Sequence, residues 1–227
     1  YNEYYHRYKL PLEELIYNGS YPEVAVNRDI RDLWAGSYIR TYIERDVRQI
    51  VNVKEIRLFQ TFIGLCAAHH GQELNAASIS RECGITQPTV MRWISILENS
   101  FIVYLLRPYY KNLGKRLIKS PKMYFIDSSI AAFLTRQGNP GSLFDGPQGG
   151  AFFEGFIIME TCKIITSGNI NAGLFFWRSH DGVEVDMIIE FHGKLLAVEI
   201  KKTSTPSTRH AEPLIKFTAI AGNDNIA

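Results

Sequence analysis

Charged residues interrupt two apolar runs in the stretch "VEVDMIIEFHGKLLAVEIKK", which spans residues 183–202. The two runs flank His192-Gly193, the kind of Xaa-Gly pair that a two-residue hairpin loop favours. A hairpin centred on this pair places Asp186 directly opposite Glu199. The pattern therefore predicts a β-hairpin that carries a carboxylate pair across its two strands.

Two carboxylates in this position repel each other, and metal binding is the chemistry that would relieve the repulsion. Cross-strand Cβ atoms lie about 4.5–5.5 Å apart, and like charges at about 5 Å cost roughly 3 kcal/mol at an effective dielectric of about 20. A favourable cross-strand pair contributes only about 0.2–1 kcal/mol, so we expect a cation between Asp186 and Glu199. Oxygen ligands suit Mg²⁺ or Mn²⁺. Lys201 is placed to balance charge or to steer a nucleophile.

The same register predicts which face of the hairpin is buried, because side chains alternate along a strand. The charged face comprises Glu184, Asp186, Glu199 and Lys201. The opposite face is apolar and is expected to be the core side; it comprises Val185, Met187, Ile189, Leu196, Val198 and Ile200. The alternative interpretation of the charged face is a solvated sheet surface with an ion pair between Glu184 and Lys201.

Asp186, twelve intervening residues and then Glu199-Ile200-Lys201 resemble the signature of the PD-(D/E)xK nucleases, with a spacing similar to that of archaeal Holliday-junction resolvases. Val185 stands where the family name has proline. The resemblance implies a further acidic residue on the preceding helix, and Glu154 in "AFFEGFIIME" is at the matching position.

By this resemblance, Asp186, Glu199 and Glu154 would hold the divalent ion. Lys201 would help to orient or activate the water that attacks a phosphodiester, so the implied catalytic residues are Asp186, Glu199 and Lys201. The alternative is a nuclease fold that has lost catalysis and serves as a binding scaffold.

The middle of the sequence has helix-turn-helix spacing. In "LNAASISRECGITQPTVMRW", Asn75 can cap a short helix that runs to Cys83, and Gly84 suits a left-handed helix end. Thr86 can cap a second helix, with Pro88 in its first turn. A short helix, a tight turn and a longer helix together predict a helix-turn-helix motif.

Two strand candidates follow at 101–106 and 123–126, and a basic segment separates them. From Arg107 to Lys122 the sequence has six basic residues and no acidic one. With a further helix predicted upstream, from about residue 52 to 70, these elements form a winged-helix pattern, and the basic hairpin favours DNA as a partner. The second helix would face a major groove through Gln87, Thr89 and Arg92. The residues expected to meet phosphates are Lys111, Lys115, Arg116, Lys119 and Lys122. The alternative is a winged-helix module that packs against protein.

The composition is typical of a globular protein, with 227 residues, 46% of them hydrophobic and 21% charged. The net charge is only +2, so nucleic-acid binding would depend on local patches. Three scattered cysteines, Cys66, Cys83 and Cys162, fit neither a disulfide framework nor a zinc motif and favour a cytoplasmic setting. No run of about 18 apolar residues occurs, so we expect no membrane partner.

These patterns predict an α/β (α+β) chain, in which a helical and winged-helix region precedes a restriction-endonuclease-like domain with a mixed sheet. Residues 1–24 are interpreted as a linker from a missing upstream module, and 25–135 as the helical and winged-helix domain. The Gly- and Pro-rich segment 136–150 is interpreted as a linker. Residues 151–227 are interpreted as the nuclease-like domain, truncated at its C-terminus.

From "NGSYPEV" to "AVEIKK" the chain resembles the C-terminal half of a prokaryotic AAA-type ATPase family that carries a domain of unknown function, DUF4143. The matching segments are "YIRTYIERDVRQI", "GQELN", "GITQPTVMRWISILENSFIVYLLRPYYKNLGKRLIKSPKMYFID" and "GVEVDMII" with "AVEIK". The resemblance implies an upstream P-loop module that binds ATP. This chain contains no G-x-x-x-x-G-K-[ST], so nucleotide binding is not predicted for its own residues. The expected function is the DNA-binding, nuclease-like output half of an ATPase, and the alternative is a regulatory or partner-binding module.

Overall fold

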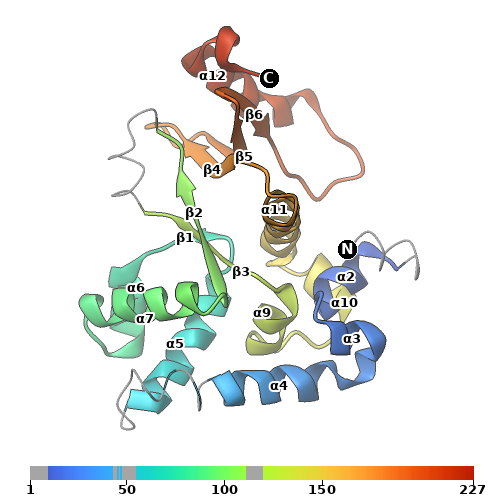
Figure 1. The fold of residues 1–227 in the computed structure, drawn as a ribbon, viewed down its shortest axis with the longest axis vertical. Helices are drawn as coiled ribbons and strands as arrows, with labels where there is room; N and C mark the ends of the chain where they lie inside the picture. The colour runs from blue at the N-terminus through green and yellow to red at the C-terminus, as the bar shows by residue number, and fades with distance from the viewer. Residues whose placement is uncertain (1–9, 43–44, 46, 48–54, 111–119) are drawn as a thin grey trace.

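The computed structural model describes residues 10–42, 45, 47, 55–110 and 120–227, which form a mixed α/β structure (Figure 1). A six-stranded sheet runs through it in the order β1-β3-β2-β4-β5-β6. Among these strands β2 and β4 are parallel neighbours, and the other neighbouring pairs are antiparallel. In the part of the chain that the structure describes, no helix combines the length and the apolar character needed to cross a membrane.

The first part of the chain is mainly helical. Its elements are α2 (Leu12–Asn18), α3 (Pro22–Val26), the 3₁₀ helix η1 (Arg28–Ile30), α4 (Arg31–Tyr42), α5 (Ile56–Ala68), β1 (Gln72–Glu73), α6 (Ala76–Cys83), α7 (Gln87–Asn99), β2 (Val103–Pro108), β3 (Lys122–Phe125) and α9 (Ser128–Leu134). These helices bury a large core in which the Trp93 ring meets Phe59 and Phe62 edge-on, at centroid distances of 5.2 and 5.3 Å. Such aromatic contacts stabilise α5 against α7.

The helix ends predicted around the turn at Gly84 are confirmed. The side chain of Asn75 accepts a hydrogen bond from the Ser78 amide at 3.0 Å, and Gly84 has the left-handed φ of 66°. Thr86 Oγ1 accepts from the Thr89 amide at 3.3 Å, so it caps α7. The predicted inner face of α7 is buried, with Val90, Ile94 and Leu97 in the core.

The remaining part of the chain places its strands between two helices. Its elements are α10 (Pro140–Asp145), α11 (Gly149–Ser167), β4 (Ala172–Arg178), β5 (Glu184–Phe191), β6 (Lys194–Val198), the 3₁₀ helix η4 (Thr208–Ala211), α12 (Glu212–Ala221) and the 3₁₀ helix η5 (Asn223–Asn225). Ile158 and Met159 of α11 pack against one face of the sheet. Phe217 of α12 packs against the other face, so both faces of β4-β5-β6 are covered.

The segment 136–150, interpreted as a linker from its glycines and prolines, contains helix α10. Asn139 caps this helix by accepting a hydrogen bond from the Ser142 amide at 2.8 Å. Leu143 is buried in the large core. The proline of this segment therefore starts a short helix at Pro140, where its missing N–H costs nothing.

The sheet and α11 connect the two parts of the chain. Arg107 of β2 pairs with Phe175 of β4, which joins the strands of both parts into one sheet. Phe152 lies in the large core, whereas Ile158, further along the same helix, lies in the cluster against β4 and β5. The two parts are therefore held together by hydrogen bonds and apolar packing as well as by the chain itself.

Candidate functional site

The predicted hairpin and its register are confirmed. His192 and Gly193 both have positive φ, 48° and 74°, as a type I′ turn requires. Met187 pairs with Val198, which is the register that the turn predicted. The turn residues thus determine how β5 and β6 align and bring the chain after Val198 towards the start of β5.

A β-bulge in β5 determines the side on which Asp186 lies. The β4–β5 register shifts between Phe175 and Trp177, and two β5 residues, Asp186 and Met187, stand opposite Phe176 alone. Strict alternation would send these two neighbours to opposite faces, whereas a bulge re-aims one of them. Asp186 accordingly joins the side of the sheet that α11 covers.

The prediction of one apolar face and one charged face is wrong in part. Met187, Ile189, Val198 and Ile200 do pack together on the α11 side. Val185, however, packs against α12 together with Ile188, and so lies apart from the other residues of the predicted apolar face. Simple alternation failed because the sheet lies between two helices and because the bulge interrupts the period of two.

Asp186 and Glu199 converge on the ammonium of Lys201. Lys201 Nζ lies 3.1 Å from Asp186 Oδ2 and 2.7 Å from Glu199 Oε1. The Ile200 amide also donates to Asp186 Oδ2, at 2.8 Å. The side chains of Asp186 and Glu199 are 7% and 8% exposed and that of Lys201 is 42% exposed. The two acids therefore share one cation, and in this structure the cation belongs to the chain.

The electrostatics of Asp186, Glu199 and Lys201 are compatible with further positive charge beside the two carboxylates. Burial raises the pKa of Glu199; the hydrogen bond from Lys201 opposes this rise and the charge of Asp186 adds to it. Burial alone would lower the pKa of Lys201, but its bond to Glu199 and the charge of Asp186 raise it above the ordinary value. Glu199 Oε2 is buried without a hydrogen-bond partner. A buried acceptor of this kind is a position that a cation could satisfy.

Glu154, the third expected ligand, lies on α11 near this group. Its Oε1 accepts hydrogen bonds from Lys122 Nζ at 2.9 Å and from the Tyr124 hydroxyl. Burial raises the pKa of Glu154, the Lys122 ammonium lowers it, and the charge of Asp186 raises it again. Within the described residues, no three His, Cys, Asp or Glu side chains are grouped so as to hold a metal ion. Asp186 and Glu199 thus form a pair around Lys201, and Glu154 does not join them in this conformation.

Lys122 lies inside the protein and not on a wing surface. It is 5% exposed and forms ion pairs with Glu154 and Glu184. Glu184 Oε2 also lies 3.0 Å from Arg178 Nε, so Glu184 faces these two cations and not Lys201. The Lys122 side chain is therefore not available to a phosphate in this conformation. Sequence reasoning missed this role because both acidic partners come from distant elements, α11 and β5.

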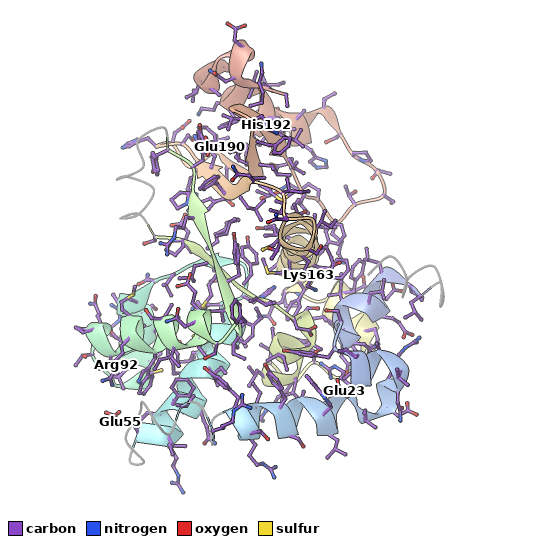
Figure 2. The ribbon with its side chains drawn as sticks, in the orientation of Figure 1. Glu23, Glu55, Arg92, Lys163, Glu190 and His192 are labelled. Carbon is purple, nitrogen blue, oxygen red and sulfur yellow. The ribbon has the colours of Figure 1, made fainter. Side chains whose placement is uncertain are left out.

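The three residues expected to read DNA do not share one surface. Gln87 is exposed and lines a groove between α7 and strands β1 and β2, together with Met91 and Ser95. The Thr89 hydroxyl is hydrogen-bonded to Thr86 Oγ1 at 2.9 Å. Arg92 points instead towards α5, where its Nη2 lies 3.8 Å from Glu55 Oε2 (Figure 2). The other expected phosphate contacts, Lys111, Lys115, Arg116 and Lys119, fall outside the described residues.

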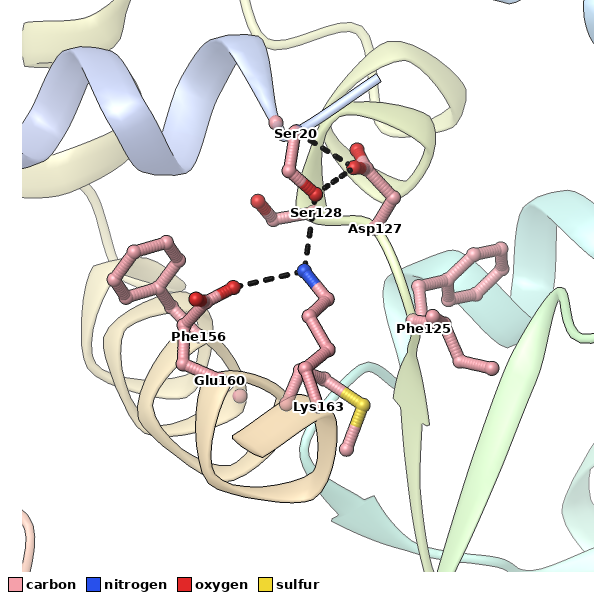
Figure 3. Close-up of a pocket in the computed structure, with 11 residues that line it drawn as sticks. Ser20, Phe125, Asp127, Ser128, Phe156, Glu160 and Lys163 are labelled. Carbon is pink, nitrogen blue, oxygen red and sulfur yellow. Dashed lines mark hydrogen bonds and ion pairs between the residues drawn. The ribbon is translucent and has the colours of Figure 1, made fainter. Parts of the chain in front are cut away.

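A second polar group, which the sequence did not indicate, surrounds a water-sized cavity beside α11 (Figure 3). Lys163 Nζ donates to Glu160 Oε1 at 2.8 Å and to Ser20 Oγ at 2.9 Å. The Ser20 amide and hydroxyl donate to Asp127 Oδ2 at 2.8 and 3.0 Å. These polar groups satisfy one another's hydrogen bonds. The cluster therefore holds the α2–α3 connection against α9 and α11, and we assign it a structural role.

Comparison with known proteins relates the chain to domains and to proteins without an assigned activity. Residues 149–226 match DUF4143, a domain of unknown function that is often found with AAA-type ATPases. Uncharacterized protein Rv2008c of Mycobacterium tuberculosis and Uncharacterized protein Mb2031c of Mycobacterium bovis are each 31% identical over 175 residues, which is 77% of this chain. The chain spans 38% of the length of these curated relatives. No solved structure matches it.

The match that covers most of the chain lies in its first part. Residues 10–141 match the model of DUF8612, a domain of unknown function. This region contains every element from α2 to α9, including the buried core around Trp93. Because this match covers more than half of its 227 residues, the chain belongs to the DUF8612 family.

Proposed function

We propose that the chain is the DNA-acting part of a larger, ATPase-associated protein, and that its C-terminal part is a nuclease-type module that cleaves phosphodiesters with Mg²⁺ or Mn²⁺. The observation that carries the proposal is the convergence of Asp186 and Glu199 on a single ammonium, at 3.1 and 2.7 Å. A position that already attracts one cation between two buried carboxylates is suited to a divalent ion. ATP would bind to a separate module of the larger protein.

The roles of the residues follow from their exposure and partners. Asp186 and Glu199 would hold the ion, and Glu199 Oε2, buried without a partner, would gain one. Lys201 is the most exposed of the three and would turn outward to orient the attacking water or the phosphate. When bound, the ion would polarise the phosphate and lower the pKa of a coordinated water.

The order of elements in the helical part supports DNA as the partner. Helix α5, strand β1, helices α6 and α7, and strands β2 and β3 follow one another, and β1 pairs with β3. This order fits a winged helix, with α7 as the helix that would enter a groove. The basic residues between β2 and β3 would supply the phosphate contacts.

A second candidate is a regulatory or protein-binding module without catalysis. It is favoured by the engagement of Glu154 with Lys122 at 2.9 Å, which leaves two carboxylates for an ion and not three. In this case Lys201 would be a permanent counter-ion that stabilises the hairpin, and the nuclease-like arrangement would serve as a scaffold.

Incubation of the purified chain with branched and linear DNA plus Mn²⁺ tests the two candidates. Cleavage that is lost in Asp186→Ala and in Lys201→Ala supports the nuclease. The matched control is Asp181→Ala, which removes an acid that is 63% exposed and pairs with Lys216 of α12. DNA binding without cleavage supports the scaffold. Absence of DNA binding contradicts the nuclease and leaves the protein-binding module.

A further inference from the structure

One row of α7 side chains faces the groove between this helix and strands β1 and β2. The groove has a volume of about 650 Å³, and the α7 residues that line it include Gln87, Met91, Ser95 and Glu98. At about 3.6 residues per turn, these four residues fall within about 80° of the helix circumference. The first three of them are exposed. This row therefore defines the open side of α7.

The two other α7 residues expected to read DNA lie on a different side of the helix. Arg92 and Thr89 stand about 140° and about 200° around the helix axis from Gln87. The Thr89 hydroxyl is bonded to Thr86 Oγ1. Arg92 Nη2 lies 3.8 Å from Glu55 Oε2. A duplex that meets the row would consequently not be read by Thr89 or Arg92.

We propose that the row on α7 reads A·T base pairs in the major groove of duplex DNA, with Gln87 on adenine and Met91 on the methyl group of thymine. The proposal rests on DNA as the partner in the proposed function. Gln87 is the first residue of α7. In a helix-turn-helix it is the N-terminal residues of the second helix that contact base edges.

The chemistry of the two side chains matches this base pair. The Gln87 amide offers a donor and an acceptor side by side, which is the combination that pairs with N7 and N6 of adenine. Met91 lies one turn further along and is 46% exposed. Its apolar end can contact the thymine methyl group, which protrudes into the major groove. The Ser95 hydroxyl, one turn later again, can serve as donor or acceptor to either kind of base pair.

The charges around the groove are balanced, so the row is suited to discrimination and not to general attraction. Two acids line the groove, and each is paired with an arginine: Glu73 with Arg178, and Glu98 with Arg107 at 3.9 Å. The first three residues of the row carry no charge. They release no counterions from DNA and contribute nothing to its salt-dependent binding. Phosphate contacts must therefore come from other residues, whereas the row acts on the choice of base.

Selection from a pool of random duplexes, carried out with the purified chain in EDTA to prevent cleavage, would identify the preferred sequences. We expect them to share an A·T pair whose exchange for G·C lowers the affinity about fivefold or more. Fluorescence anisotropy on the selected duplex then tests single groups of atoms. Replacement of the adenine by 7-deazaadenine removes N7 and should lower the affinity about fivefold. Uracil in place of thymine removes the methyl group and should lower it about fourfold.

Each modified base should lose its effect in one variant only. Gln87→Ala should bind the 7-deazaadenine duplex as well as the unmodified one and should still respond to uracil, and Met91→Ala should show the reverse. Gln87→Asn and Met91→Leu keep the amide and the apolar end, so both should retain the preference. Arg92→Gln is the matched control, because it removes an exposed cation of the same helix outside the row. It should weaken binding to all duplexes alike and leave the base preference unchanged.

The outcomes separate this proposal from the proposed function. The proposal is overturned if the bound duplexes show no base preference, or if the modified bases act equally on the natural chain and on both alanine variants. Loss of the preference in Arg92→Gln also overturns it, because the other side of α7 would then read the bases. In all three cases DNA remains the partner. Absence of binding to every duplex refutes DNA as the partner, and the base-reading role with it.

Discussion

Glu199 and Lys201 are two positions apart in the chain, and the Lys201 ammonium lies 2.7 Å from Glu199 Oε1. Residues i and i+2 of an extended segment point to the same side, so this contact is local. Asp186 reaches the same ammonium from the neighbouring strand, at 3.1 Å. The hairpin register therefore brings a distant acid to a lysine–glutamate pair that is already adjacent.

Replacement of Lys201 by Met should destabilise the fold, because Asp186 and Glu199 would then face each other without a cation. Solvent screens this loss, since the Lys201 side chain is 42% exposed, and we expect a decrease of about 1–2 kcal/mol in the free energy of unfolding. Urea unfolding at neutral pH measures it. Mn²⁺ should restore part of the loss, because an ion that binds the folded state stabilises it. Lys194→Met, at an exposed lysine of β6, is the control; an equal loss there would contradict the explanation.

His70 should make the fold sensitive to acid. Burial lowers the pKa of His70 from 6.5 to about 4, and its Nδ1 accepts a hydrogen bond from the Phe125 amide at 3.0 Å. The unfolded chain takes up the proton at the higher pH, so stability is complete above pH 6.5 and is lost as the pH falls towards 4. The difference between the two pKa values corresponds to about 3 kcal/mol.

Unfolding free energies at several pH values between 7 and 4 would test the role of His70, with His70→Phe as the comparison. Phenylalanine keeps a ring for the stack on Phe152, where the centroids now lie 4.8 Å apart, but it does not titrate. The variant should lose less stability on acidification than the natural chain. Equal losses in the two proteins would assign the acid sensitivity to other groups.

Two helical glycines should respond to alanine in opposite directions. A Cβ on Gly155 of α11 would clash with His70 Nε2 and lie 3.0 Å from Tyr124 Cδ1, so Gly155→Ala should cost about 1–3 kcal/mol. A Cβ on Gly64 of α5 would meet nothing within 4 Å. Gly64→Ala should therefore stabilise the chain by about 0.4–1 kcal/mol, by restricting the unfolded state. Thermal and urea unfolding would measure both changes in stability. Destabilisation by Gly64→Ala would show that α5 has no room for a methyl group at this position.

The basic segment between β2 and β3 should account for the salt dependence of DNA binding. Replacement of Lys111, Lys115, Arg116 and Lys119 by Gln should reduce the slope of log affinity against log salt by about 3–4, since each phosphate contact contributes about 0.9. Fluorescence anisotropy with a labelled duplex at several KCl concentrations measures the slope. Lys194→Gln combined with Lys216→Gln, on β6 and α12, should leave it unchanged. If the slope is the same after all four substitutions, the DNA binds elsewhere on the chain.

The parts of the structure that local rules control could be predicted from the sequence. The pair His192-Gly193 determines the hairpin register, because its positive φ values define the turn. Asn75 and Thr86 cap α6 and α7 through bonds to amides three residues away. The strands predicted at 101–106 and 123–126 appear as β2 and β3, displaced by at most two residues. Each of these features depends on neighbours in the chain.

The parts that depend on distant contacts could not be predicted. The basic run suggested an exposed Lys122, yet acids from α11 and β5 enclose its ammonium. The bulge at Asp186 arises from pairing with β4, and β5 contains no glycine or proline that would have indicated it in the sequence. The parallel pairing of Arg107 in β2 with Phe175 in β4 joins the two parts of the sheet, and it produces no local pattern in the sequence. Sequence reasoning therefore found the carboxylate pair and missed the cation held beside Glu154.

The single extra residue in β5 has a consequence for how such sequences can vary. Asp186 and Met187 share the α11 side, so loss of Met187 would remove the bulge and restore strict alternation while the other residues of the strand kept their sides. Glu184 would still face Lys122, whereas one more inserted residue would turn Glu184 and all residues before it towards the α12 layer. The strand should accordingly tolerate the loss of this one codon better than the gain of another.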